Sequence, residues 1–138
     1  MDYQTILRAV AAMLAGGAAA SGWTAAVIVA NTAFDGLDHG RADRMLRRVL
    51  VATASFQALL LIGATVCAFV GGAMASAIVA AIAALGFFSN VWTLAPRKDK
   101  APEGLRKKNT TMRMVAVALT LMVTLIAVGA AVMSALGI

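Results

Sequence analysis

The sequence has little charge and almost none of the residue types that build metal or redox sites. Its 138 residues include one histidine and one cysteine, and only 13% are Asp, Glu, Lys or Arg. Cys67 has no second cysteine with which to form a disulfide. Haem held between helices usually needs a pair of ligands, and His39 lies outside the apolar stretches. The sequence therefore predicts no metal and no cofactor.

Charged residues and histidine are also missing from the interior of the long apolar stretches. Ion-coupled transporters, proton relays and voltage sensors depend on such groups within the membrane, so their absence argues against these three classes. What the chain has instead is apolar side chains. They make up 62% of the residues, against roughly 45–50% in ordinary soluble domains. This composition predicts an integral membrane protein.

Four apolar stretches are long enough to cross a membrane, at about 8–33, 49–70, 74–95 and 111–137. The uncharged run 49–95 would reach about 70 Å as one helix, which is more than twice the hydrocarbon thickness. It must therefore reverse, and Gly71-Gly72 near its midpoint predicts the turn. We expect Asn109 or Thr110 to cap the last span. The predicted fold class is all-α, a single-domain integral membrane four-helix bundle.

The basic residues are distributed unevenly along the chain. Eleven of the twelve Lys and Arg residues lie in two segments, 41–48 and 97–113, and the remaining one is Arg8. Basic residues in short loops stay on the cytoplasmic side during insertion. We therefore expect two basic cytoplasmic loops, both termini outside, and a location in a bacterial-type inner (plasma) membrane.

These basic residues flank spans and have no interleaved aromatic residues, so the sequence does not favour nucleic acid as a partner. Anionic lipid is the counter-charge that we expect. The residues predicted to contact lipid headgroups are Arg44, Arg47, Arg48, Arg97, Lys98, Lys107, Lys108 and Arg113.

Small residues recur at helical spacing within the spans. Gly16 and Ala20 share one face of the first span, Gly17 and Ser21 share an adjacent face, and Gly63 belongs to a similar stripe in the second. Small residues four apart let membrane helices approach closely. They either pack the four helices of one chain or, on one face, hold a helix of another subunit or of a second copy.

Polar residues in the spans are mostly hydroxyls, which we expect to bond to their own helices. Gln57 differs, because a buried amide must find a partner in hydrocarbon. We predict that it bonds across the bundle, to a hydroxyl of the first or last span. We expect Asn90 to lie nearer the cytoplasmic surface, in contact with water.

One loop holds a cluster of acidic residues, with Asp35, Asp38 and His39 followed by Asp43. Such a cluster suggests a divalent metal, as in Asp-rich enzymes that transfer phospholipid headgroups, but the spacing does not match a calcium loop. The interpretation that we favour is that Asp38 caps a basic helix over 41–48 that continues into the second span. The sequence predicts no catalytic residue.

Two functional classes remain open. The first is a structural or accessory subunit that docks on a larger membrane complex through a face of small residues. The alternative is a small oligomeric channel or facilitator, with an uncharged pore lined by Ser, Thr, Gln and Asn. An enzyme acting on lipid through the acidic loop ranks last.

Overall fold

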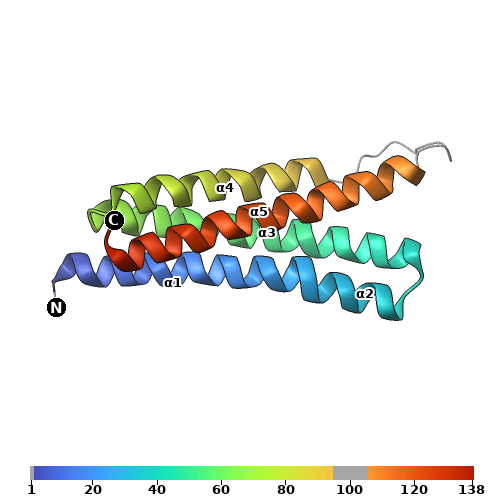
Figure 1. Ribbon diagram of the computed structural model, residues 1–138, viewed down its shortest axis with the longest axis horizontal. Helices are drawn as coiled ribbons and strands as arrows, with labels where there is room; N and C mark the ends of the chain where they lie inside the picture. Colours follow the sequence, from blue (N-terminus) through green and yellow to red (C-terminus); the bar gives the residue numbers. More distant parts are fainter. Residues whose placement is uncertain (1, 95–105) are drawn as a thin grey trace.

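The described part of the chain is almost entirely helical (Figure 1). The computed structural model describes residues 2–94 and 106–138. The elements in order are α1 (Tyr3–Trp23), the π-helical turn η1 (Thr24–Val29), α2 (Ala30–Gly36), α3 (His39–Val70), α4 (Met74–Leu94) and α5 (Arg106–Leu136). Because α1, η1 and α2 follow one another without a gap, the described chain forms four long helical rods. The predicted all-α four-helix bundle is confirmed.

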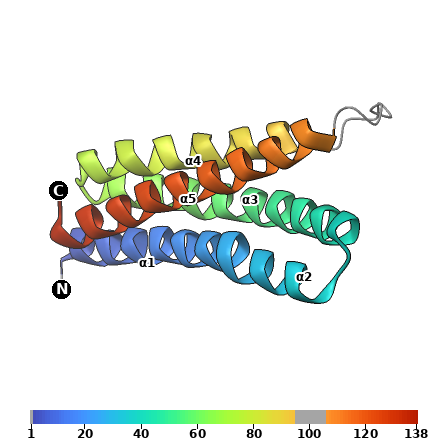
Figure 2. The same cartoon turned by 45° about the vertical axis from the view of Figure 1, so that its right-hand side comes forward.

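The four rods pack in a ring. The rod that begins with α1 lies between α3 and α5, and α4 lies between the same two helices on the other side, whereas α3 and α5 are diagonal neighbours with little contact. Both chain ends lie at one end of the bundle, and the α2–α3 connection lies at the opposite end (Figures 1 and 2). We call the first the terminal end and the second the basic end, because the arginines of residues 41–48 lie near the α2–α3 connection.

Each rod is long and apolar enough to cross a membrane, over Tyr3–Ala33, Gly40–Val70, Met74–Thr93 and Met114–Leu136. The basic segment 41–48 is continuous with the second span in α3, as predicted. Asp38 occupies the N-cap position of α3 without a side-chain capping bond. The cap predicted at Asn109 or Thr110 is wrong, because α5 begins at Arg106 and runs through both residues.

The reversal between α3 and α4 is the glycine turn that the sequence predicts. Gly72 has a φ of +78°, in the left-handed region that favours glycine. The amide of Ala73 donates to the carbonyl of Ala68 at 2.9 Å, so an end carbonyl of α3 is satisfied within the turn.

Side-chain size is inverted relative to a soluble bundle. Apart from five larger residues, the buried apolar side chains of the described chain are all alanine; the five are Leu46, Leu50, Leu61, Phe87 and Val123. Large apolar side chains lie on the outside along the helices, for example Leu59 and Leu125, each 68% exposed. Small residues inside and large apolar ones outside suit packing in lipid. The chain is a small multi-pass membrane protein.

Candidate functional site

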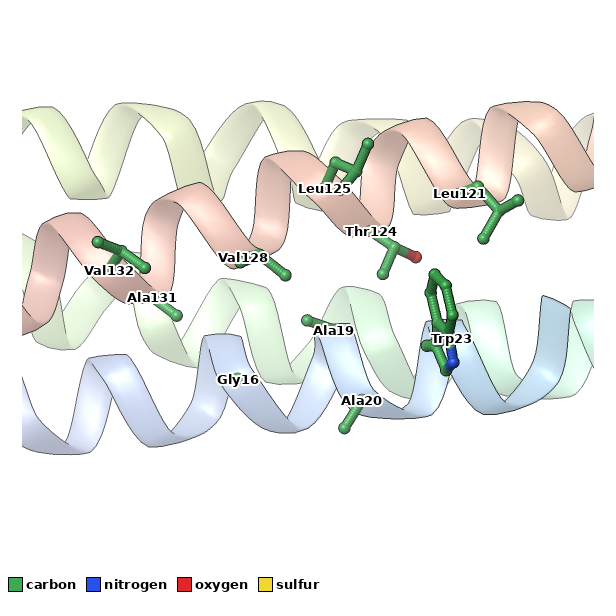
Figure 3. Close-up of a pocket in the computed structure, with 10 residues that line it drawn as sticks. All are labelled: Gly16, Ala19, Ala20, Trp23, Leu121, Thr124, Leu125, Val128, Ala131 and Val132. Atoms are coloured by element: carbon green, nitrogen blue, oxygen red, sulfur yellow. The ribbon is translucent and has the colours of Figure 1, made fainter. Parts of the chain in front are cut away.

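A groove runs along the seam between α1 and α5 (Figure 3). Its volume is about 510 Å³, and its lining is almost wholly apolar. Gly16 and Ala20 form part of it on α1, and Val128 and Val132 form part of it on α5. The indole of Trp23 points across the seam toward α5 (Figure 3). A smaller groove of about 330 Å³ lies on the opposite seam, between α3 and α4.

The small-residue stripes of α1 turn out to lie at the edge of the bundle. A Cβ on Gly16 would meet no heavy atom within 4 Å, and Ala20 beside it is exposed. A Cβ on Gly17 would only reach ordinary contact with Leu60, at 3.9 Å. Neighbouring helices of the same chain therefore leave the Gly16 face uncovered, and this face forms part of the groove.

Other glycines permit the close approaches inside the bundle. A Cβ on Gly22 would collide with Oγ1 of Thr124, where α1 crosses α5. A Cβ on Gly86 would lie 2.7 Å from a methyl carbon of Val123, where α4 meets α5. Gly63 lies against α1, with 3.3 Å between its Cβ position and a leucine methyl carbon. Sequence spacing singled out Gly63 but not Gly22 or Gly86, because their contacts depend on where α5 lies.

At the terminal end, Arg8 joins three helices. Its Nε donates to the carbonyl of Gly71 at 2.8 Å, and a Cβ on Gly137 would lie 2.7 Å from its guanidinium. The hydroxyl of Ser134 donates to the Arg8 carbonyl at 3.0 Å. The cation thus lies at the carboxyl ends of α3 and α5, where the helix dipoles favour positive charge. Sequence reasoning counted Arg8 only as an external charge, because its partners lie more than sixty residues away.

At the basic end, the structure describes three of the residues predicted to contact lipid. Arg44 and Arg48 are exposed on the first turns of α3. Arg47 Nε lies 3.3 Å from a carboxylate oxygen of Asp43, an ion pair by distance without hydrogen-bond geometry. Arg97 and Lys98 lie outside the described residues. Lys107, Lys108 and Arg113 lie in the first turns of α5, and their side chains are outside the described part.

Two amides lie in the core. Gln57 on α3 and Asn90 on α4 are each only 1% exposed, so the expectation that Asn90 contacts water at the surface is wrong. Asn90 Nδ2 donates to Oγ1 of Thr120 on α5 at 3.1 Å. Gln57 Nε2 forms no hydrogen bond within the described residues, so the hydroxyl partner predicted for it is absent there. The sequence did not identify the Asn90 bond, since it depends on the rotation of α4 about its axis.

Most hydroxyls in the spans bond to their own helices, as predicted; these include Ser21, Thr24, Thr53, Thr65, Thr120 and Thr124. Ser76 and Ser134 are exceptions that bond across the bundle. Ser76 Oγ donates to the carbonyl of Ala130 at 2.9 Å and so joins α4 to α5. These two serines join the C-terminal half of α5 to α4 and α1.

Among the side chains that the structure describes, which do not include that of His39, the acidic loop does not form a metal site. No group of three or more His, Cys, Asp or Glu side chains among them is close enough to hold an ion. Asp35 and Asp38 are exposed, and Asp43 pairs with the arginine one turn further along α3. This arrangement gives the lipid-enzyme hypothesis no support.

Comparisons of the chain with protein families, with curated proteins and with solved structures find no match.

Proposed function

We propose that the chain is a structural or accessory subunit, which binds a transmembrane helix of a larger membrane complex in the groove between α1 and α5. The observation that carries this proposal is the position of Gly16. Its Cβ would meet nothing within 4 Å, although it lies midway along a helix of a packed bundle. The bundle therefore leaves open a surface of α1 where another backbone can approach closely.

Physical chemistry favours a helix as the occupant of this groove. Membrane helices gain little from the hydrophobic effect when they associate, so they depend on close van der Waals packing against small residues. The groove has glycine and alanine along α1 and larger apolar side chains such as Val128 and Val132 along α5. A helix placed there would approach the α1 backbone closely and would contact the larger side chains of α5.

The test is to fill the groove without disturbing the bundle. Gly16→Leu places a large side chain in the groove and meets no neighbour at its first atom. Gly129→Leu is the matched control: a Cβ there also meets nothing within 4 Å, and Gly129 does not line the groove. We expect Gly16→Leu to remove co-purifying subunits in mild detergent while the bundle stays folded, and Gly129→Leu to keep them. Retention of the partner by both variants would contradict the proposal.

We also propose that the basic end faces the cytoplasm of a bacterial-type inner membrane, with both termini outside. The arginines of residues 41–48 and the start of α5 lie at the same end of the bundle, which supports this orientation through the preference of Lys and Arg for the cytoplasmic side. The exposed arginines of α3 would then lie among the headgroups of the inner leaflet. Each such residue near anionic lipid contributes about 1 kcal/mol to binding.

The alternative function, a small oligomeric channel with an uncharged pore, has less support. Buried side chains from all four long helices meet in one cluster at the centre of the described bundle, and the largest of them are Leu61 and Phe87. A pore would therefore have to lie between copies of the chain. Purification that yields a symmetric oligomer without other subunits would favour this alternative.

A further inference from the structure

The core of the bundle is divided by a layer of polar side chains. Gln57, Asn90 and Thr120 are all buried, with exposures of 1%, 1% and 3%. Between this layer and the end that holds both chain termini lies the central apolar cluster, which includes Ala58, Phe87 and Val123. On the basic side lies a second apolar cluster, which includes Leu46, Leu50 and Ala116. The polar layer is thus enclosed between two apolar clusters along the length of the bundle.

Two fully buried side-chain atoms of the layer, one donor and one acceptor, form no hydrogen bond within the described residues. Asn90 Nδ2 donates to Oγ1 of Thr120, and that hydroxyl donates to the carbonyl of Ala116 at 2.8 Å. Within the described residues, Asn90 Oδ1 accepts no hydrogen bond and Gln57 Nε2 donates none. The two unpaired atoms are complementary, because one is an acceptor and the other a donor.

The two amides lie close together along the bundle. Gln57 directly precedes Ala58 on α3, and Asn90 lies one helical turn beyond Phe87 on α4, on the same side of that helix. Ala58 and Phe87 belong to the same buried cluster, and α3 and α4 are neighbours in the ring. Gln57 lies 14 residues before Gly71 and Asn90 lies 17 residues after Ala73, so in two helices joined by this turn the amides lie within about one helical turn of each other along the bundle. Both are buried, so both lie on faces turned toward the core.

The π-helical turn η1 of the first rod lies at the same level of the bundle as the polar layer. The turn η1 begins at Thr24, two residues after Gly22, and the Cβ position of Gly22 abuts Phe87 and Thr124. π-helical turns inside α-helices often occur at functional sites. Polar side chains on α3, α4 and α5 therefore lie at the same level as a break in helical regularity on the first rod.

We propose that this layer is an internal water-binding site, in which a water molecule accepts a hydrogen bond from Gln57 Nε2 and donates one to Asn90 Oδ1. Unpaired amides in an apolar core are costly, and a buried water that bonds two or more polar groups removes that cost. Water is the ligand whose chemistry fits, because it is small and both donates and accepts. The bound water links α3 to α4, and through Asn90 and Thr120 it links them to α5.

The sign of a stability change tests this proposal. Gln57→Met keeps the size of the side chain and removes the amide. If water bridges the amides, the variant loses the bridge and its folding equilibrium constant in detergent falls about fivefold to tenfold. If Gln57 Nε2 is unpaired, the constant rises instead, which would overturn the proposal. Thr65→Val is the control, because the Thr65 hydroxyl bonds to its own helix and the change should have little effect.

A second measurement uses the unaltered protein and detects the water itself. The chain has only two glutamines, Gln4 and Gln57, so selective ¹⁵N labelling of glutamine leaves two side-chain NH₂ groups to observe. The signals of the exposed Gln4 are identified because they disappear in Gln4→Glu. We expect the Gln57 amide to show a cross-peak to a long-lived water molecule in nuclear magnetic resonance spectra. A cross-peak to the Asn90 side chain without one to water would mean a direct amide–amide bond and would overturn the proposal.

Discussion

Replacing Gly22 with alanine is expected to destabilise the bundle, whereas the same replacement at Gly16 is expected to leave it folded. Both glycines lie on α1, six residues apart, and differ in what a methyl group would meet. At Gly22 the new carbon collides with Oγ1 of Thr124 and lies 3.4 Å from the ring of Phe87. At Gly16 it meets no heavy atom within 4 Å. The pair therefore tests which face of α1 packs inside the bundle.

Two opposing terms set the size of the effect. Alanine is favoured over glycine inside a helix by about 1 kcal/mol, and this term is the same at both sites. Adding a methyl group to a filled site costs about 1–3 kcal/mol. Thr124 cannot rotate freely to make room, because it is β-branched and its hydroxyl donates to the Thr120 carbonyl at 2.7 Å. We therefore expect Gly22→Ala to be about 1–3 kcal/mol less stable than Gly16→Ala.

A compensating change separates this collision from other causes. Thr124→Ala removes the obstructing oxygen, so the double variant with Gly22→Ala should recover most of the lost stability and show a favourable coupling energy. Reversible unfolding in mixed detergent micelles, followed by circular dichroism, measures the free energy of unfolding for each variant. Equal stabilities for Gly16→Ala and Gly22→Ala, or a double variant whose effects simply add, would refute the packing described for α1 against α5.

Three further predictions concern the two ends of the bundle. Arg8→Gln removes a charge-assisted bond to the Gly71 carbonyl, and because Arg8 is partly exposed we expect a loss of about 1 kcal/mol, seen as faster amide exchange at the α3–α4 turn. In a Cys67→Ser background, a cysteine at position 2 should react with an impermeant thiol reagent added outside intact cells, and one at position 101 should not; labelling at 101 would contradict the proposed orientation. Native mass spectrometry should show a preference for cardiolipin or phosphatidylglycerol over neutral lipid, which weakens when the three exposed arginines of α3 are replaced with glutamine: Arg41, Arg44 and Arg48. An unaltered protein without this preference would argue against the lipid proposal.

Local patterns in the sequence were sufficient to predict the four spans and the turn between α3 and α4. A charge-free run too long for one crossing had to reverse, and Gly71-Gly72 is where the backbone can take a positive φ. The start of α5 was placed too late, because the polar residues near 109 and 110 resemble a cap, although they are also compatible with a helix interior. Span length and backbone freedom are local properties, so they can be predicted without knowing which helices are neighbours.

The candidate sites depend on which helices meet, and spacing alone does not determine that. Gly16 and Gly22 both lie on α1, yet one faces an open groove and the other abuts Thr124. Asn90 was predicted to lie near the cytoplasmic surface because it is close to the end of its span, whereas the rotation of α4 places it in the core beside Thr120.

The sequence by itself determined that this protein crosses a membrane with four helices, because hydrophobic length and the distribution of charge depend only on residue order. The tertiary structure alone decided that Arg8 joins the ends of α3 and α5, that a groove remains open beside Gly16, and that Gln57 and Asn90 share a buried layer. The physical reason is that each of these features joins residues on different helices. Their proximity is set by the ring order and by the rotation of each helix about its axis, which result from the packing of the whole bundle.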